Sequence, residues 1–310
     1  MQFSVAIDNA TLDNLGLEME PVPSNVIKTY PQRGPLQQFR FAESTAFRCF
    51  KCGASKKSKL ITIYTGSWSK RLCNGCYGQL LSLYKIKAGA RGDDERSEAL
   101  ASALLAAVAR QDRREAERLF RTNETRAAYL TPEAVRFIAT AEHIAAKLQS
   151  EPQLEWSPAV IGLCKAVEFE LVSRILLPLA KSSIGADLSV DRNDKDLRRV
   201  VNFCVDQSRP TPELGTFAHF LQTVIHSRRR RETSTIIRNF LQLAGDWTGS
   251  NWILDPASFY QSLNTLTTNF RNRAAHIDEL AEHNYLGCRD LVIGAQGVIW
   301  KLVEATKRHR

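Results

Sequence analysis

The sequence lacks a long hydrophobic run, and this absence argues against one whole class of proteins. No apolar stretch among the 310 residues reaches the roughly 18 residues that indicate a membrane-spanning helix. The first residues are acidic and lack the basic and then apolar order of a signal peptide. We therefore expect a cytoplasmic protein without a membrane partner.

Three common catalytic signatures are also missing from the sequence. The chain has no glycine-rich phosphate loop, no carboxylate cluster spaced for two metal ions and no Gly-x-Ser-x-Gly turn. These absences argue against nucleotide-driven enzymes, two-metal nucleases and hydrolases that carry a serine on such a turn. No internal repeat is evident, which argues against a repeat architecture.

Charge is present in an ordinary amount, but it is unbalanced towards the positive. Charged residues make up 24% of the chain and hydrophobic residues 44%, which is enough for real cores. The net charge is +9 and the pI about 9.3, which weakly favours a polyanionic partner such as nucleic acid. The one dense run, four arginines at 228–231, has the ordinary interpretation of a solvent-exposed face.

Helix signals dominate the chain after residue 91. Four segments open with a capping residue followed by proline, an order that suits the first turn of a helix. These pairs are Thr131-Pro132, Ser157-Pro158, Thr211-Pro212 and Asp255-Pro256. A final run over 288–307 has helical periodicity, whereas strand-like alternation is confined to 59–65. The sequence therefore predicts a mainly α protein with a small β-rich module near the N-terminus.

Composition divides the chain into four predicted segments. Residues 1–45 contain several prolines and glycines without sustained periodicity, so we expect an N-terminal arm. We expect residues 46–90, which contain four of the seven cysteines, to be a small separate module that ends in a glycine-containing break at 88–94. We expect a helical connector over 91–155 and a helical domain over 156–310.

Two matching cysteine pairs mark the small module. Cys49 and Cys52 form one Cys-x2-Cys pair, Cys73 and Cys76 form the other, and twenty residues separate the pairs. Each pair fits one tight turn, and two such turns complete a tetrahedral set of thiolates. Neither a redox pair nor chance explains two matching pairs. Four cysteine ligands leave no open position on the metal ion, so they predict a structural Zn²⁺ in a zinc ribbon. The lysines of this ribbon could contact nucleic acid, or the ribbon could bind a protein, and the sequence leaves both open.

The second informative stretch contains Arg271, Asn272 and His276. Here the sequence resembles the HEPN superfamily, whose members carry an arginine, a following polar residue and a histidine after four intervening positions. The resemblance covers roughly residues 157–310, and it includes an early helix with acidic residues, here Glu168 and Glu170. It implies a HEPN-like helical bundle in which Arg271, Asn272 and His276 are the catalytic residues.

The residue types of this motif suit RNA cleavage without a metal ion. A 2′-hydroxyl can attack the adjacent phosphate if a histidine moves protons near neutral pH and an arginine fork holds the developing charge. A five-residue offset turns about 140° on a straight helix, so Arg271 and His276 would not share one face. Either the helix bends near Ala274 and Ala275, or two chains share the site. The resemblance implies the second arrangement, a homodimer with one composite cleft.

Two functions remain open at this point. The first is a metal-independent endoribonuclease that cleaves RNA by 2′-hydroxyl attack, with Glu168 or Glu170 orienting Arg271. By resemblance, such an enzyme is a phage-defence or toxin effector with an inhibitory or sensor protein partner. The alternative is a non-catalytic adaptor that binds nucleic acid or a protein, in which the motif is a polar patch. Cys164, Cys204 and Cys288 are predicted to be small buried hydrophobes.

Overall fold

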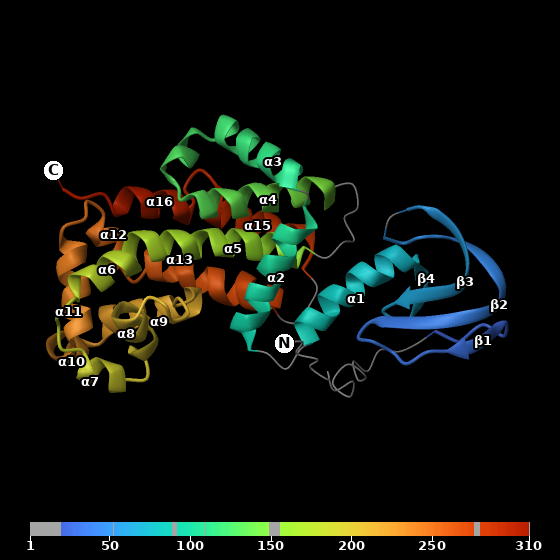
Figure 1. The fold of residues 1–310 in the computed structure, drawn as a ribbon, viewed down its shortest axis with the longest axis horizontal. Helices are drawn as coiled ribbons and strands as arrows, with labels where there is room; N and C mark the ends of the chain where they lie inside the picture. The colour runs from blue at the N-terminus through green and yellow to red at the C-terminus, as the bar shows by residue number, and fades with distance from the viewer. Residues whose placement is uncertain are drawn as a thin grey trace. The chain divides into compact units, whose positions relative to one another are not determined.

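The computed structural model describes residues 20–51, 53–88, 92–108, 110–148, 156–275 and 280–309. The chain divides into two compact units, one of residues 1–100 and 150–154 and the other of residues 101–149 and 155–310. The fold is mainly helical with a small antiparallel sheet near the N-terminus (Figure 1), which confirms the predicted fold class at this level. No helix in the described stretches is both long and apolar enough to cross a membrane.

The four strands of the sheet lie side by side in sequence order. They are β1 (Val26–Thr29), β2 (Leu36–Arg48), β3 (Ser55–Tyr64) and β4 (Ser67–Leu72). All three pairings are antiparallel, and each contains a register shift. β3 includes all of the predicted alternating segment 59–65 except Thr65, which lies in the turn after the strand. Side chains on one face form a small apolar cluster of Phe39, Phe41, Phe47, Ile61 and Ile63.

The sheet begins earlier in the chain than the sequence predicts. The arm expected over residues 1–45 contains β1 and most of β2. In β2 the buried Phe39 and Phe41 flank the exposed Arg40, which is the period-two pattern of a strand with one buried face. This alternation is short, and a register shift between β2 and β3 follows it at Arg40, so it does not stand out in the sequence. Residues 1–19 lie outside the described residues.

Helix α1 (Asn74–Ala88) follows the sheet in the N-terminal unit. Its Leu80 and Tyr84 pack in a second apolar cluster with Leu36 and Tyr64 of the sheet. Gly34 has φ +61°, and a Cβ at this position would lie 2.5 Å from the Tyr84 ring. Glycine is therefore required at this point, because it alone combines that backbone conformation with so close an approach.

All remaining secondary-structure elements of the described chain are helices. In order they are α2 (Asp93–Ala107), α3 (Arg110–Asn123), η2 (Thr125–Tyr129), α4 (Pro132–Leu148), α5 (Ser157–Leu171), η3 (Val172–Leu176), α6 (Leu177–Ser182), α7 (Ser189–Asn193), α8 (Arg198–Val205), α9 (Leu214–His226), α10 (Arg228–Thr233), α11 (Thr235–Gly245), α12 (Ser250–Leu254), α13 (Phe259–Thr265), η4 (Leu266–Arg271), α14 (Asn272–Ala275), α15 (Glu282–Ile293) and α16 (Val298–Ala305). η2 is a 3₁₀-helix, whereas η3 and η4 are π-helices.

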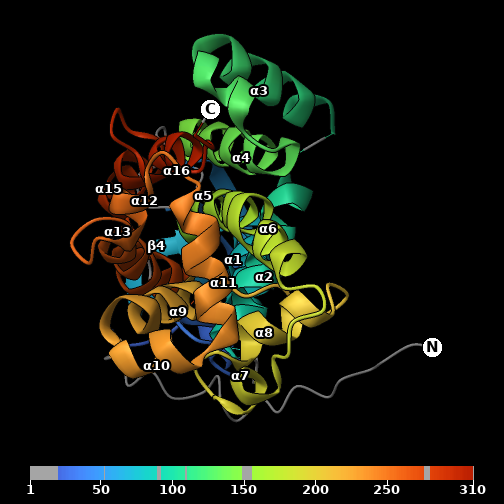
Figure 2. The ribbon, with the colours of Figure 1, turned by 90° about the vertical axis from the view of Figure 1, so that its left-hand side faces the viewer.

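Helix α5 is the centre of the helical unit. Nearly all of its residues are buried, including the charged Lys165, Glu168 and Glu170, so α5 is enclosed by other helices on every side. It packs against α4, α15, α16, α14 and η4, and Figure 2 shows it among the surrounding helices. Such a helix gives fixed positions to side chains on its neighbours, including those of the motif.

The predicted helix starts are partly confirmed. α4 begins at Pro132, and α5 begins at Ser157 with a proline in its first turn. α9 begins two residues after Pro212, and α13 begins three residues after Pro256. Asp255 caps a turn instead, because its Oδ1 accepts from the Ala257 N–H at 3.2 Å. The predicted closing run is interrupted between α15 and α16, around Gly294 and Gly297.

Candidate metal centre and arginine site

Three of the four predicted metal ligands lie together in the N-terminal unit. The Sγ atoms of Cys49, Cys73 and Cys76 are all within 4.8 Å of one another. Four thiolates at about 2.3 Å from a tetrahedral zinc ion would have their sulfurs about 3.8 Å apart. The cluster is therefore compact enough to hold a metal ion. Cys52 lies outside the described residues.

The local backbone explains why these sulfurs converge. After Cys49 the chain makes a tight turn in which Gly53, at φ +67°, donates its N–H to the Cys49 carbonyl at 2.9 Å. Cys73 directly precedes α1, and Cys76 lies in its first turn. The N-terminal end of a helix favours a negative thiolate. The Cys73 N–H also donates to Cys49 Sγ at 3.3 Å, which joins the two halves of the site.

The other three cysteines are buried in the helical unit, as the sequence predicts. Cys164, Cys204 and Cys288 lie among apolar side chains and form no disulfide. Burial raises the pKa of the Cys204 thiol to about 12, and burial also raises the pKa of Cys288. Both thiols are therefore protonated near neutral pH, unlike thiols that bind a metal ion.

Arg271 is buried in the helical unit and firmly held. Its side chain is 3% exposed, and its Nη2 donates to Glu213 Oε2 at 2.6 Å. Its Nη1 donates to Asn272 Oδ1 at 3.2 Å. The structure thus brings together the first two residues of the predicted catalytic set. The third, His276, lies outside the described residues.

The helix that carries Arg271 changes its winding just before the motif. The α-helical turns of α13 give way to the π-helix η4, which ends at Arg271 and is followed by α14. Thr267 and Thr268 donate their hydroxyls to the carbonyls of Leu263 and Asn264, a pattern that bends helices. A bend near Ala274 and Ala275 is one of the two arrangements that the sequence leaves open; the irregularity in the described residues lies earlier, before Arg271. It rotates later side chains relative to a straight helix.

The two acidic residues predicted to orient Arg271 have other partners. Glu170 is fully buried, and its Oε1 accepts the Thr131 N–H at 2.6 Å while its Oε2 lies 2.5 Å from Arg174 Nε. It therefore fixes the start of α4. Glu168 Oε2 lies 2.7 Å from Lys165 Nζ, and its Oε1 accepts the Leu214 N–H at 3.5 Å. Glu168 thus supports the first residue of α9, directly beside Glu213.

The carboxylate that holds Arg271 is one that sequence reasoning missed. Glu213 directly precedes α9 and is 22% exposed. The Thr211-Pro212 pair indicates a helix start nearby, but no linear pattern shows that Glu213 meets Arg271. The exposed Arg199 lies close by, because its Nη1 donates to Thr216 Oγ1 in the first turn of α9 at 3.2 Å. Two arginines therefore approach the N-terminal end of one helix.

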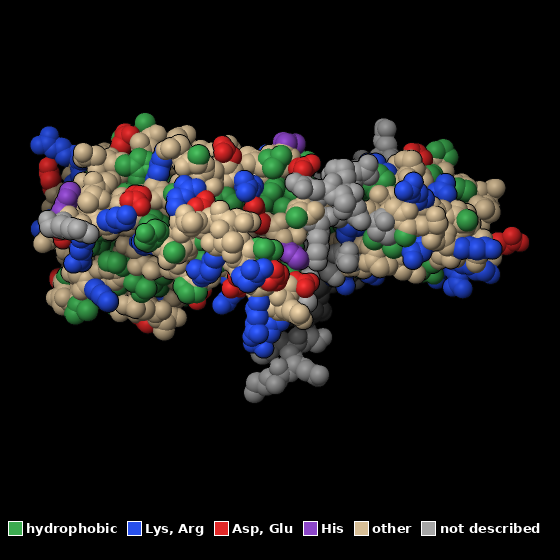
Figure 3. All heavy atoms as spheres, turned by 90° about the horizontal axis from the view of Figure 1, so that it is seen from above, with side chains coloured by type: hydrophobic (Ala, Val, Ile, Leu, Met, Phe, Trp, Pro, Cys, Tyr) green, Lys and Arg blue, Asp and Glu red, His purple; other side chains and the backbone are tan. Residues whose placement is uncertain are grey.

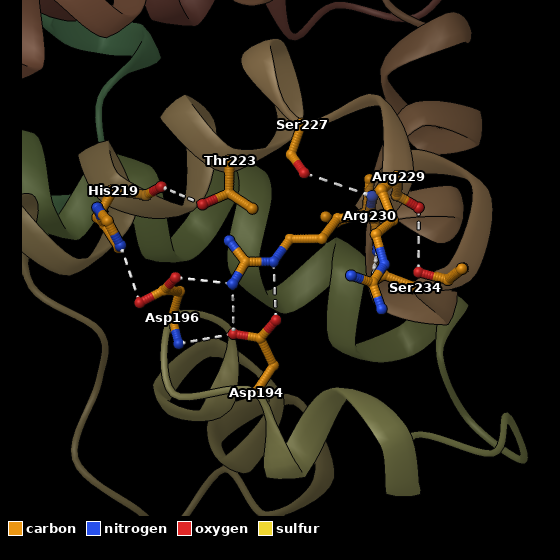
Figure 4. A network of polar contacts seen from close by, with 10 residues as sticks. Asp194, Asp196, His219, Thr223, Ser227, Arg229, Arg230 and Ser234 are labelled. Atoms are coloured by element: carbon orange, nitrogen blue, oxygen red, sulfur yellow. Dashed lines mark hydrogen bonds and ion pairs between the residues drawn. The ribbon is translucent and has the colours of Figure 1, made fainter.

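The arginine run of α10 has both a solvent-facing and a structural part. Arg228, Arg229 and Arg231 are exposed, as predicted for the run. Arg230 instead turns inward, with its Nε 2.8 Å from Asp194 and its Nη2 2.8 Å from Asp196 (Figure 4). Hydrogen bonds from Arg230 and then His219 hold the pKa of Asp196 below its usual value. This network joins α10 and α9 to the segment before α8.

Comparison of the chain with protein-family models, with curated proteins and with solved structures finds no match. The case for function therefore depends on the residues themselves.

Proposed function

We propose that this protein is a metal-independent endoribonuclease whose helical unit is HEPN-like and whose catalytic residues are Arg271, Asn272 and His276. The observation that supports it most is that Glu213 and Asn272 hold the guanidinium of Arg271, inside the motif, in one orientation. A π-helix at this point is a second support, because such irregular turns are frequent at functional sites. The third support comes from the sequence, in which Arg271, Asn272 and His276 match the HEPN motif.

Arg271 would stabilise the charge that develops on the attacked phosphate. Catalytic donors are most effective when they are already oriented, because no reorganisation is then needed during the reaction. Glu213 and Asn272 hold the guanidinium in one orientation. The fork geometry of arginine suits two phosphate oxygens at once. Asn272 would thus position Arg271 through its amide oxygen.

His276 would move the proton. It would accept the proton of the RNA 2′-hydroxyl, whose oxygen then forms a bond to the adjacent phosphorus. The bond from phosphorus to the 5′-oxygen breaks, and that oxygen takes up a proton from the protonated histidine. The products are a 2′,3′-cyclic phosphate and a 5′-hydroxyl. The atoms balance without a metal ion, water or another reactant, since all reacting groups belong to the RNA and the imidazole.

The metal centre would be a structural Zn²⁺ held by Cys49, Cys52, Cys73 and Cys76. Three of these sulfurs form a compact group in which Cys49 and Cys76 are buried and Cys73 is half-buried, and thiolate is the donor that structural zinc sites prefer. An ion with four thiolates has no open position for a substrate. Its role would be to keep the β2–β3 turn and the start of α1 together, not to take part in cleavage.

Assembly and cellular role complete the proposal. The helical unit would form a homodimer in which Arg271 and His276 of both chains line one cleft. By its resemblance to HEPN nucleases, the protein would act in the cytoplasm as a phage-defence or toxin effector, controlled by an inhibitory or sensor protein. These statements depend on the ribonuclease activity and are tested only after it.

The alternative is an adaptor that binds nucleic acid or a protein without cutting. One observation favours it: Arg271 is buried and its charge is paired with Glu213, which also describes an ordinary structural ion pair. An adaptor would need Arg271 for stability and not for chemistry.

Incubation of the purified protein with RNA in EDTA separates the two functions. The ribonuclease proposal predicts fragments with 5′-hydroxyl ends that depend on His276. Intact RNA after binding would support the adaptor.

A further inference from the structure

Positive charge is concentrated in the N-terminal unit. Residues 20–88 contain 12 Lys and Arg but only two acidic residues, Glu20 and Glu43, which gives a formal charge of +10. The whole chain carries +9, so this one stretch accounts for all of the net charge. A zinc ion with four thiolates would add a small net negative charge. Most of the positive charge of residues 20–88 would remain.

Most of these basic side chains are in contact with solvent. The exposed members are Lys28, Arg33, Arg40, Arg48, Lys56, Lys57, Lys59 and Lys85. Figure 3 shows Lys and Arg side chains spread over this unit, on the right of the view, with few acidic ones among them. The surface is therefore positive over a wide area.

Four of the basic residues share one face of the sheet. Phe39, Phe41 and Phe47 of β2 belong to the apolar cluster on one face, so Arg40, Ala46 and Arg48 point to the other face by alternation. Lys28 lies opposite Arg40 in the β1–β2 register, and Lys57 lies opposite Ala46 in the β2–β3 register. We call Lys28, Arg40, Arg48 and Lys57 the basic face.

The basic face is unfavourable for the isolated protein. Like charges directly opposite each other on neighbouring strands repel, and Lys28 and Arg40 are such a pair. One of the two acidic residues is engaged elsewhere, because Glu20 accepts from Ser67 Oγ at 2.7 Å and from the Trp68 N–H at 2.9 Å. An extended polyanion would relieve this repulsion at several points at once.

We infer that the basic face binds the sugar–phosphate backbone of nucleic acid. Strands about 4.8 Å apart carry the four cations in an extended pattern, which fits the repeated charges of a nucleic-acid chain better than a single small anion. Backbone contacts of this kind give affinity without sequence preference. The inference does not require the helical unit to cut RNA.

The test is binding of the full-length protein to a fluorescent 2′-deoxy oligonucleotide, which 2′-hydroxyl chemistry cannot cleave. Three proteins are compared by fluorescence anisotropy over a range of salt concentrations. The first is the wild type. The second carries Lys28→Gln, Arg40→Gln and Lys57→Gln. The third carries Arg192→Gln, Arg229→Gln and Arg231→Gln, three exposed arginines of the helical unit. Both variants lose the same charge, and far-ultraviolet circular dichroism with zinc content establishes that each is folded.

The basic-face variant is expected to bind roughly tenfold more weakly or worse, with a salt slope smaller by about 2, since each lost contact to a single strand contributes about 0.7 to that slope. The arginine control is expected to bind the oligonucleotide with an affinity close to that of the wild type. Equal weakening in both variants would mean that net charge alone drives binding, and would overturn the inference. So would unchanged binding of the basic-face variant, or binding to vesicles containing phosphatidylserine but not to the oligonucleotide. Because no cleavage is measured, failure here is distinct from failure of the ribonuclease proposal.

Discussion

Arg271 and Glu213 lie 58 positions apart in the sequence, yet Arg271 Nη2 donates a 2.6 Å hydrogen bond to Glu213 Oε2. The position of the motif arginine therefore depends on where α9 begins. Glu168 supports that beginning through the Leu214 N–H. A chain of contacts thus runs from the central helix α5 through the start of α9 to the motif.

Glu213→Gln tests this dependence. The variant keeps an oxygen acceptor but loses the charge that pairs with a buried guanidinium, and we expect a loss of about 1–3 kcal/mol in the free energy of unfolding. Ribonuclease activity should also fall, since Arg271 would no longer be held. Urea denaturation measures the first effect. Glu232→Gln, at an exposed ion pair with Arg228, is the matched control and should change stability by less than about 0.5 kcal/mol. Wild-type stability and activity in Glu213→Gln would contradict the account.

The Asp196–Arg230 contact should stabilise the protein in a pH-dependent way. The pKa of Asp196 is lowered in the folded state, so its contribution is present above the ordinary pKa and is lost as the pH falls through the folded-state pKa. A double-mutant cycle of Asp196→Asn and Arg230→Gln should show a coupling of about 1 kcal/mol at pH 7. The coupling should be smaller near pH 3. A coupling that grows with acidity would show the opposite sign and would contradict the assignment.

Metal analysis tests the proposed zinc centre. We expect one zinc per chain in the wild type and a large loss of zinc in Cys73→Ser, because three thiolates hold the ion less firmly than four. Cys204→Ser is the control, because it removes a buried thiol of the helical unit, and this variant should retain one zinc per chain. The helical unit of Cys73→Ser should remain folded, as followed by the circular dichroism signal of its helices. A wild-type protein with well under one zinc per chain would count against the site.

Light scattering tests the shared site. We expect a dimer at the protein concentrations at which RNA is cleaved, with the interface in the helical unit. The measurement uses the full-length chain. A monomeric protein with full activity would exclude a cleft made from two chains.

The cysteine cluster and two of the four proline-marked helix starts could be predicted because each has a local signal in the sequence. Cys73 and Cys76 lie close together because two residues between cysteines fit one tight turn, and the matching pair at Cys49 indicated that the two halves would meet. Pro132 begins α4 because its missing N–H has no partner in a first turn. The mainly helical fold followed from the same kind of local pattern.

Long-range contacts could not be predicted in this way. Glu213 has no local feature that distinguishes it from other glutamates, and only the packing of α9 beside η4 brings it to Arg271. Glu168 and Glu170 had the expected place on α5, but the sequence could not show which neighbouring N–H groups their carboxylates would reach.

The break between α15 and α16 had a local signal in the sequence, since Gly294 and Gly297 lie at its two ends.

The most direct test of the central claim compares cleavage of one RNA with its 2′-deoxy counterpart in EDTA. Wild type, His276→Ala, Arg271→Ala and the control His309→Ala, which alters an exposed histidine, are assayed together, and zinc content is measured afterwards. We predict that wild type and the control cut only the RNA, and that His276→Ala loses about 10²–10⁴-fold in rate. Arg271→Ala should lose about 10²–10³-fold. Cleavage of the deoxy strand, a strict need for added magnesium or full activity in His276→Ala would contradict the proposed mechanism.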